Sequence, residues 1–242
     1  MRVVSLIVVL LGVGALGVIG AGSVAQTPPP PPPALPGPPP IVAPPVATTT
    51  PAPTTTPATT ATARPAGPSR AIGLPWRGRL VNGVELPEVS ADWLTWDPVL
   101  RQIPNRPERR WGTANLIATL RRVLAGFHAA HPELGQVLIG DLSRPHGGVF
   151  DQRYGGLGHA SHQNGVDADV YYPRADHRLL AAYKPNLIDH ALAQELVDRF
   201  VDVGAQKIFT GPSLRLTGPR KVVSKLVHHD DHLHVRLFNP DR

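Results

Sequence analysis

The chain has 242 residues, with 24 lysines and arginines against 18 aspartates and glutamates, and no cysteine. Without cysteine there is no disulfide framework, lipid-attachment site or thiolate, so a metal must be bound by histidine and carboxylate, and a nucleophile must be a hydroxyl or a water. The formal charge of +6 is dispersed and no basic motif is interleaved with aromatic residues, which argues against nucleic acid as a partner.

An apolar run from Val3 to Ala25 follows Met1-Arg2 and ends in small residues. It fits an export signal with cleavage after Ala25. It is also long enough to serve as an uncleaved membrane anchor, because about 20 apolar residues span a bilayer. In both cases we expect residues 1–25 to direct the chain to the periplasm or cell envelope, or to its secretion. A basic exported domain is attracted there to polyanionic envelope polymers.

A linker is predicted over residues 26–70. Between Gln26 and Ser69 lie 17 of the chain's 29 prolines, together with threonine and alanine repeats. This composition cannot join a packed core and forms a disordered, extended and semi-rigid spacer. We interpret it as a passive tether, with a proline-rich docking ligand as the alternative. The folded domain is then residues 71–242, which is enough chain for one core.

The first predicted element of that domain is a β-hairpin over residues 80–86. Asn82-Gly83 stands there between apolar residues, and this dipeptide is the strongest short hairpin signal because both turn residues must reach positive φ. We expect the tryptophans of this region to close the core, with a platform for wall glycan as the alternative: Trp76, Trp93, Trp96 and Trp111.

Two helices follow from apolar residues at helical spacing. The second runs from about 187 to 203, with Asn186 as its cap, Pro185 before it and Gly204 after it. The first is capped by Thr113, and its apolar positions recur every three or four residues: Leu116, Ile117, Leu120, Val123, Leu124 and Phe127.

Four strands are predicted, over residues 136–141, 166–172, 206–210 and 232–238. A loop with glycines at 147, 148, 155, 156 and 158 separates the first two. Runs of strands with two flanking helices indicate an α+β domain with a small, largely antiparallel sheet.

Two of these strands have one polar and one apolar face, because successive strand side chains alternate. In the last strand His232, His234 and Arg236 share a face opposite leucine and valine. In the second, Asp167 and Asp169 do the same. Neighbouring strands of this kind can place Asp169 beside His234.

A further imidazole, His162, precedes Asp169 by seven residues across Gly165, and glycine permits a tight turn into the strand. Three nitrogen and oxygen ligands with an open fourth position are the usual composition of a catalytic zinc site. The sequence therefore predicts such a site on the sheet face.

Three stretches, GDLS at 140–143, GHASHQNGVDAD at 158–169 and HDDHLHVR at 229–236, make the chain resemble the penicillin-insensitive murein endopeptidases. Through H-x-x-G-x-x-x-D followed by H-x-H it also resembles the wider group of lysostaphin-type and D-Ala-D-Ala zinc peptidases. The resemblance covers residues 140–238 and implies an α+β zinc hydrolase.

The resemblance also implies roles for individual residues. His162, Asp169 and His234 match the zinc ligands, His232 matches the general base, and His229 matches a further active-site histidine.

His159 matches a position that contacts an additional metal or the substrate. Where the family places further acid and imidazole groups after the first motif, this chain offers Asp189 and His190, at a spacing unlike that of the family, so one and two metals stay open. Arg144, Arg153 and Arg236 are candidates for binding a substrate carboxylate. The acids at 230 and 231 are expected to be solvated or to orient a histidine.

These observations predict an exported zinc metalloendopeptidase that hydrolyses peptide cross-links, the D-alanyl amide bonds of bacterial peptidoglycan, with a zinc-activated water. Two alternatives remain. The same motifs would support a carboxypeptidase or dipeptidase that acts on D-alanine ends, and the fold would also serve a wall-binding module without turnover.

Overall fold

The structure is a computed structural model that describes residues 67–151 and 159–241. The predicted signal or anchor, nearly all of the predicted linker, and the loop glycines at 155, 156 and 158 lie outside the described residues. Within the two described ranges, neither helix has the length and apolar character needed to cross a bilayer.

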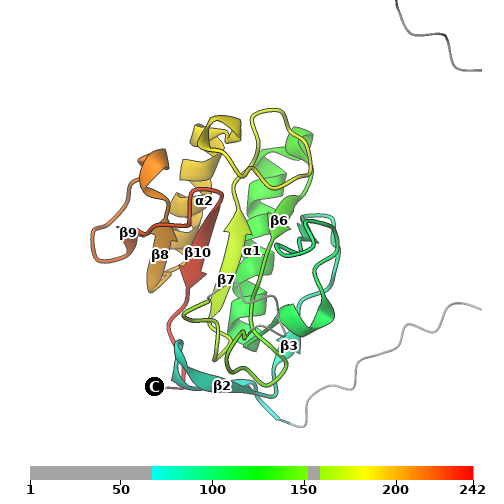
Figure 1. Ribbon diagram of the computed structural model, residues 1–242, viewed down its shortest axis with the longest axis vertical. Coiled ribbons are helices and arrows are strands. Elements are labelled where there is room, and N and C mark those ends of the chain that lie inside the picture. Colours follow the sequence, from blue (N-terminus) through cyan, green and yellow to red (C-terminus); the bar gives the residue numbers. More distant parts are fainter. Residues whose placement is uncertain (1–66, 152–158, 242) are drawn as a thin grey trace, which may run out of the picture. The chain divides into compact units, whose positions relative to one another are not determined.

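The fold is α+β, with two helices packed on a six-stranded sheet (Figure 1). The helices are α1 (Ala114–Ala130) and α2 (His190–Asp202). The strands, in their order across the sheet, are β4 (Trp93–Thr95), β6 (Val137–Ile139), β7 (Asp167–Tyr171), β10 (His232–Arg236), β8 (Lys207–Thr210) and β9 (Val223–Lys225).

The sheet is mixed but mostly antiparallel, in line with the expectation of a largely antiparallel one. Its three inner pairings are antiparallel, whereas the edge pairings of β4 with β6 and of β8 with β9 are parallel. Parallel neighbours require a crossover connection, and α1 supplies it between β4 and β6.

Two small antiparallel ladders precede and flank this sheet, and they show that the predicted hairpin at 80–86 is wrong. β2 (Arg77–Val81) pairs over its whole length with β1 (Arg70–Leu74), and β3 (Val84–Glu85) pairs with β5 (Trp111–Gly112). The chain does turn at Asn82, whose φ is 48°. The local turn signal was correct, but both flanking strands bind other partners.

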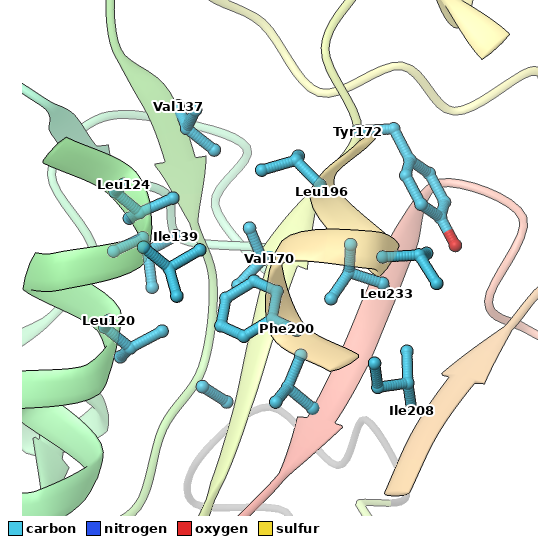
Figure 2. Close-up of a cluster of buried hydrophobic side chains, with 14 of the residues drawn as sticks. Leu120, Leu124, Val137, Ile139, Val170, Tyr172, Leu196, Phe200, Ile208 and Leu233 are labelled. Atoms are coloured by element: carbon cyan, nitrogen blue, oxygen red, sulfur yellow. The ribbon is translucent and has the colours of Figure 1, made fainter. Parts of the chain in front are cut away.

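The helices cover one face of the sheet and form the core with it (Figures 1 and 2). Thr113 caps α1 as predicted, because its hydroxyl accepts a hydrogen bond from the backbone of Leu116. All six predicted apolar positions of α1 are buried. They pack with α2 and the inner strands; Figure 2 labels Leu120, Leu124, Val137, Ile139, Val170, Tyr172, Leu196, Phe200, Ile208 and Leu233.

The second helix begins later than predicted. Asp189 is its cap and accepts a hydrogen bond from the backbone of Leu192 at 3.0 Å. Asn186 instead lies in a 3-10 turn, Pro185–Leu187. Gly204 follows the helix end with a φ of +81°, as predicted. Three more 3-10 turns, each beginning with proline, are Pro107–Arg109, Pro132–Leu134 and Pro212–Leu214.

The tryptophans meet the expectation only in part. Trp93 and Trp96 are buried and Trp111 is half-buried, whereas Trp76 is 53% exposed. The guanidinium of Arg236 lies 5.7 Å from the centre of the Trp76 ring, so this ring packs against a cation at the surface.

Candidate metal centre

The centre of the site is the polar face of two neighbouring strands. β7 and β10 pair so that Asp169 lies opposite His234 and Asp167 lies opposite Arg236. The intervening residues, among them Ala168 and leucine and valine of β10, enter the core beneath the helices. The predicted alternation is therefore confirmed, and it aims acids and imidazoles away from α1 and α2.

His162 reaches this face from the loop before β7. It has a φ of 68°, and Gly165 turns the chain into the strand with a φ of +77°. The backbone N–H of His162 donates to Asp167 at 3.0 Å. Its ring Nδ1 donates to the carbonyl of Leu142 at 2.7 Å, because a carbonyl can only accept. This leaves Nε2 unprotonated and directed at the strands.

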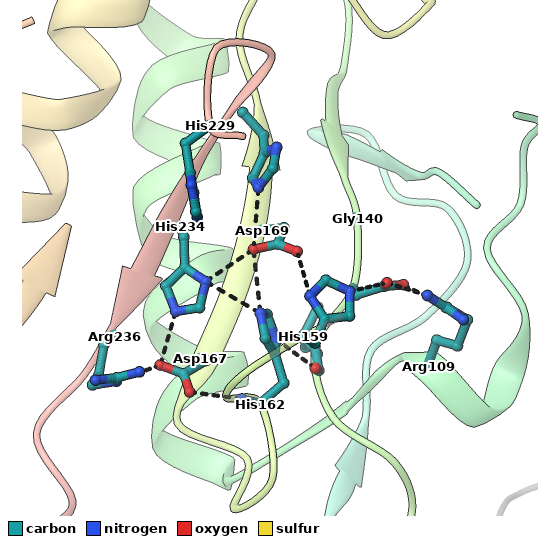
Figure 3. Close-up of polar contacts among 12 residues, drawn as sticks. Arg109, Gly140, His159, His162, Asp167, Asp169, His229, His234 and Arg236 are labelled. Atoms are coloured by element: carbon teal, nitrogen blue, oxygen red, sulfur yellow. Dashed lines mark hydrogen bonds and ion pairs between the residues drawn. The ribbon is translucent and has the colours of Figure 1, made fainter. Parts of the chain in front are cut away.

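Three candidate ligand atoms converge on one point, as Figure 3 shows. His162 Nε2 lies 3.3 Å from Asp169 Oδ1 and 3.2 Å from His234 Nδ1. His234 Nδ1 lies 3.2 Å from Asp169 Oδ1. In a tetrahedral zinc site with bonds of about 2.0 Å, the ligand atoms are separated by about 3.3 Å. The triangle therefore has the dimensions of one face of a zinc site.

The carboxylate of Asp169 lies among imidazoles. Its Oδ1 is buried without a hydrogen bond of good geometry from the described residues, although three imidazole nitrogens lie between 3.2 and 3.7 Å away. Burial raises the pKa of Asp169, but the neighbouring His162 and His232 outweigh it and hold the pKa well below its usual range. A buried carboxylate with three imidazole nitrogens around it is a donor set that fits a cation.

Asp167 holds the ligands from behind. Its carboxylate accepts from the ring Nε2 of His234 at 3.1 Å and from Arg236 at 2.7 Å, besides the backbone of His162. Burial lowers the pKa of His234, but Asp167 and Asp169 raise it to about 9. In the metal-free chain His234 therefore carries a proton near pH 7, and this proton provides the positive charge that the two carboxylates favour.

His232 lies at the edge of the ligand triangle. Its Nε2 is 3.7 Å from Asp169 Oδ1, and its Nδ1 is 2.7 Å from the carboxylate of Asp231. Asp231 therefore orients a histidine, as expected of one member of the acid pair. Burial lowers the pKa of His232, but Asp169 and Asp231 more than offset it, so the pKa is raised above the ordinary value.

His229 stands beside His232, with ring centres 4.9 Å apart. Burial and the neighbouring His232 lower its pKa to about 4, so this imidazole is neutral near pH 7. Its Nδ1 lies 2.8 Å from the carbonyl of Val227 and must donate to it, which leaves Nε2 as an acceptor. Asp230 is turned away and binds the backbone and hydroxyl of Ser213.

His159 joins the group from the other side. Together with His162 and Asp169 it offers ligand atoms that all lie within 4.8 Å of one another. Its Nε2 lies 2.7 Å from Asp141, and the guanidinium of Arg109 forms a two-pronged ion pair with the same carboxylate (Figure 3). Burial raises the pKa of Asp141, but His159 and Arg109 lower it to about 2.

The three candidate substrate arginines lie in different settings. Arg236 is buried against Asp167. Arg144 donates to the carbonyl of Val149 at 2.9 Å. Arg153 lies outside the described residues. Asp189 and His190 were considered for a second metal. Asp189 instead caps α2, and the ring of His190 contacts the carbonyl of Leu214.

The comparisons with known proteins agree with this geometry. A family model described as penicillin-insensitive murein endopeptidase matches residues 71–199. A protein of that name from Yersinia enterocolitica is 30% identical over 201 residues, covering 72% of this chain and 68% of the relative. Those from Yersinia pestis and Salmonella heidelberg, with the same coverage, are 29% and 26% identical.

The chain belongs to the penicillin-insensitive murein endopeptidase family. The family match spans α1, the loop that carries His159 and His162, and β7 with Asp169. The resemblance read from the sequence motifs is thus confirmed.

Two hollows adjoin the ligand triangle of this family member. The first, the histidine pocket, has a volume of about 240 Å³ and is lined by Asp169 and by the imidazoles at 159, 162, 229, 232 and 234. The second, the tyrosine pocket, has a volume of about 450 Å³ and is lined by Pro98, Arg101, Tyr171, Tyr183 and Asp231. Both are also lined by residues 159, 169, 228 and 232, so they are adjacent.

The sequence motifs did not indicate several of these residues. Asp141 stands in a quoted motif without a role, and Arg109 binds it from 32 positions away. Arg101 and Tyr183 enter through loops that carry no motif. Their contacts depend on how distant segments pack, and no periodic signal in one sequence predicts that.

Proposed function

We propose that the chain is an exported zinc metalloendopeptidase that hydrolyses D-alanyl peptide cross-links of bacterial peptidoglycan. The observation that carries the proposal is the triangle of His162 Nε2, Asp169 Oδ1 and His234 Nδ1, with edges of 3.2–3.3 Å. Membership of the murein endopeptidase family supports the substrate class.

His162, Asp169 and His234 would hold the zinc ion, and their donor types suit it. Each imidazole has its other nitrogen fixed, by Leu142 and by Asp167, so that the ligand nitrogen is aimed at the centre of the triangle. On His234 that nitrogen would give up its proton when zinc binds. When bound, zinc supplies a water acidified to a pKa of about 7 and polarises the scissile carbonyl.

His232 would transfer the proton. Its Nδ1 is fixed by Asp231, so its Nε2 faces the triangle. An imidazole at that place can take a proton from the attacking water and give it to the leaving amine. His229 would accept a hydrogen bond through its Nε2 on the same side, as a neutral group held by the carbonyl of Val227.

His159 would act next to the ligands. Its Nδ1 is 3.9 Å from Asp169 Oδ2 and its ring lines both pockets. In this position it can contact the substrate or an additional metal.

The setting follows from the substrate. A chain that cuts peptidoglycan must reach the periplasm or cell envelope, and the apolar segment over residues 3–25 provides an export signal or a membrane anchor. Residues 26–70 would tether the domain of residues 71–242 at a distance from that segment.

The deciding experiment measures zinc content and product masses after digestion of purified sacculi. We expect one zinc per chain and conversion of cross-linked muropeptide dimers to monomers. His234→Ala should lose both. Release of terminal D-alanine alone would favour the carboxypeptidase, and zinc-dependent binding without release would favour the wall-binding module. A wild-type chain without zinc, or a His234→Ala variant with full activity, would contradict the proposal.

A further inference from the structure

The tyrosine pocket contains an arginine that the motifs did not indicate. Arg101 is exposed at its rim, and its guanidinium lies 4.8 Å from the centre of the Tyr183 ring. Within residues 67–151 and 159–241 no carboxylate lies within ion-pair distance of it. The side chain therefore keeps its charge available to a ligand.

The backbone fixes Arg101 in this place. It has a φ of 55°, a conformation that non-glycine residues rarely adopt. The backbone N–H of Arg101 donates to the carbonyl of Asp97. The side chain of Asp97 also binds this loop, because its Oδ1 accepts from the N–H groups of Val99 and Leu100 at 2.8 and 2.9 Å. Asp97 is fully buried and paired with Arg106. These contacts hold the loop, and Arg101 with it, beside the pocket.

The aromatic wall beside Arg101 is also fixed. The hydroxyl of Tyr183 accepts from the indole N–H of Trp96 at 3.1 Å, and Tyr171 is buried with its ring centre 5.6 Å from that of His232. A guanidinium stacked on a tyrosine keeps its edge N–H groups free for a carboxylate, which it binds with two parallel hydrogen bonds.

The orientation of a substrate follows from His232, which lines both pockets. If His232 gives its proton to the leaving amine, the nitrogen side of the scissile amide lies against this ring. A carboxylate on the carbon next to that nitrogen then enters the tyrosine pocket. Arg236 and Arg144 do not line either pocket.

We propose that Arg101 binds the substrate carboxylate on the amine side of the scissile bond and so selects peptides in which that group is free. This inference rests on the proposed function of the site. Arg101 is here a specificity-determining residue, and the loss of its charge should raise KM more than it lowers kcat.

The test compares two synthetic cross-linked peptides, one with a free carboxylate beside the scissile nitrogen and one with a carboxamide there. We expect the zinc-loaded wild-type chain to have a kcat/KM about 10- to 100-fold higher for the carboxylate peptide, since hydrogen bonds to a charged group change binding by about this factor. Arg101→Gln should lose that preference, mainly through KM. Arg122→Gln removes an exposed arginine on α1, on the other face of the sheet, and should keep it.

A binding measurement separates this inference from the proposed function. Ketomethylene analogues of both peptides, in which CH₂ replaces the scissile N–H, are titrated into the zinc-loaded chain by calorimetry. We expect about tenfold or greater tighter binding of the carboxylate form by wild type and Arg122→Gln, and equal binding by Arg101→Gln. Absent hydrolysis with this binding pattern would overturn only the proposed reaction. Equal binding of both forms by wild type, or a preference retained by Arg101→Gln, would overturn the role of Arg101.

Discussion

Asp167 connects the parts of the site without offering a ligand atom itself. One carboxylate binds the backbone of His162, the ring of His234 and the guanidinium of Arg236. It is fully buried, and although burial raises its pKa, His234, His162 and Arg236 together hold the pKa below the ordinary value. A single ionised group thus fixes a loop histidine and a strand histidine, both proposed as ligands, in one frame.

Substitution of Asp167 should therefore weaken the metal without removing a ligand. We expect Asp167→Asn to lower zinc affinity about 10- to 100-fold, the usual cost of losing a partner behind a ligating histidine. Competition with a chromogenic chelator measures the affinity. Asp198→Asn, an exposed change on α2, is the control. Unchanged affinity in Asp167→Asn would show that the two histidines are held by other contacts.

Substitution of His232 should impair proton transfer without impairing metal binding. We expect His232→Ala to retain about one zinc per chain and to lower kcat about 10²- to 10⁴-fold, the range for loss of a general acid–base group. Zinc analysis and turnover of a cross-linked peptide are measured on the same preparation. His177→Ala changes an exposed histidine outside both pockets and should leave both quantities unchanged. Loss of zinc from His232→Ala would instead make His232 a ligand.

At the scale of residues, the alternation of strand side chains predicted which residues of β7 and β10 share the polar face. A period of two along β7 and β10 places Asp169 opposite His234, and Gly165 correctly marked the turn. The contact between Arg109 and Asp141 was not visible in the sequence, because these residues meet only when the 3-10 turn Pro107–Arg109 packs against the segment that follows β6. Such contacts depend on tertiary packing.

At the scale of elements, the long periodic helices were predictable and the short strands were not. α1 has six apolar positions that fix its face, whereas β1 to β5 are only two to five residues long, and β3 and β4 pair with segments far along the chain. For the same reason the Asn82-Gly83 signal gave a turn without the expected hairpin. Tertiary pairing overrode the local preference.

The start of α2 provides a quantitative test at this scale. Because Asp189 caps the helix, we expect Asp189→Ala to lower the free energy of unfolding by about 1 kcal/mol. Asn186→Ala changes the residue first predicted as the cap, which is exposed, and should alter it by less than about 0.5 kcal/mol. Urea unfolding of the metal-free chain measures both. A larger loss of stability in Asn186→Ala than in Asp189→Ala would show that the helix is capped in the 3-10 turn instead.

At the scale of the whole described domain, the site joins segments that are distant in sequence. His162 and His234 are 72 residues apart, and one lies in a loop while the other lies in the central strand β10. The helices stabilise the opposite face of the same strands. A cation between these ligands would therefore cross-link the loop to the sheet and bind the folded state alone.

Removal of the metal should accordingly destabilise the protein. At free zinc about 100 times the dissociation constant, binding stabilises the folded state by about 2.7 kcal/mol, which corresponds to roughly 5–10 °C in the unfolding midpoint of a domain this size. We expect a chelator to lower the midpoint by this amount, zinc to restore it, and magnesium, which prefers oxygen ligands, to fail. His162→Ala should respond to neither zinc nor chelator, because it lacks one ligand. A wild-type midpoint unchanged after zinc is stripped would mean that the triangle is held by the protein alone.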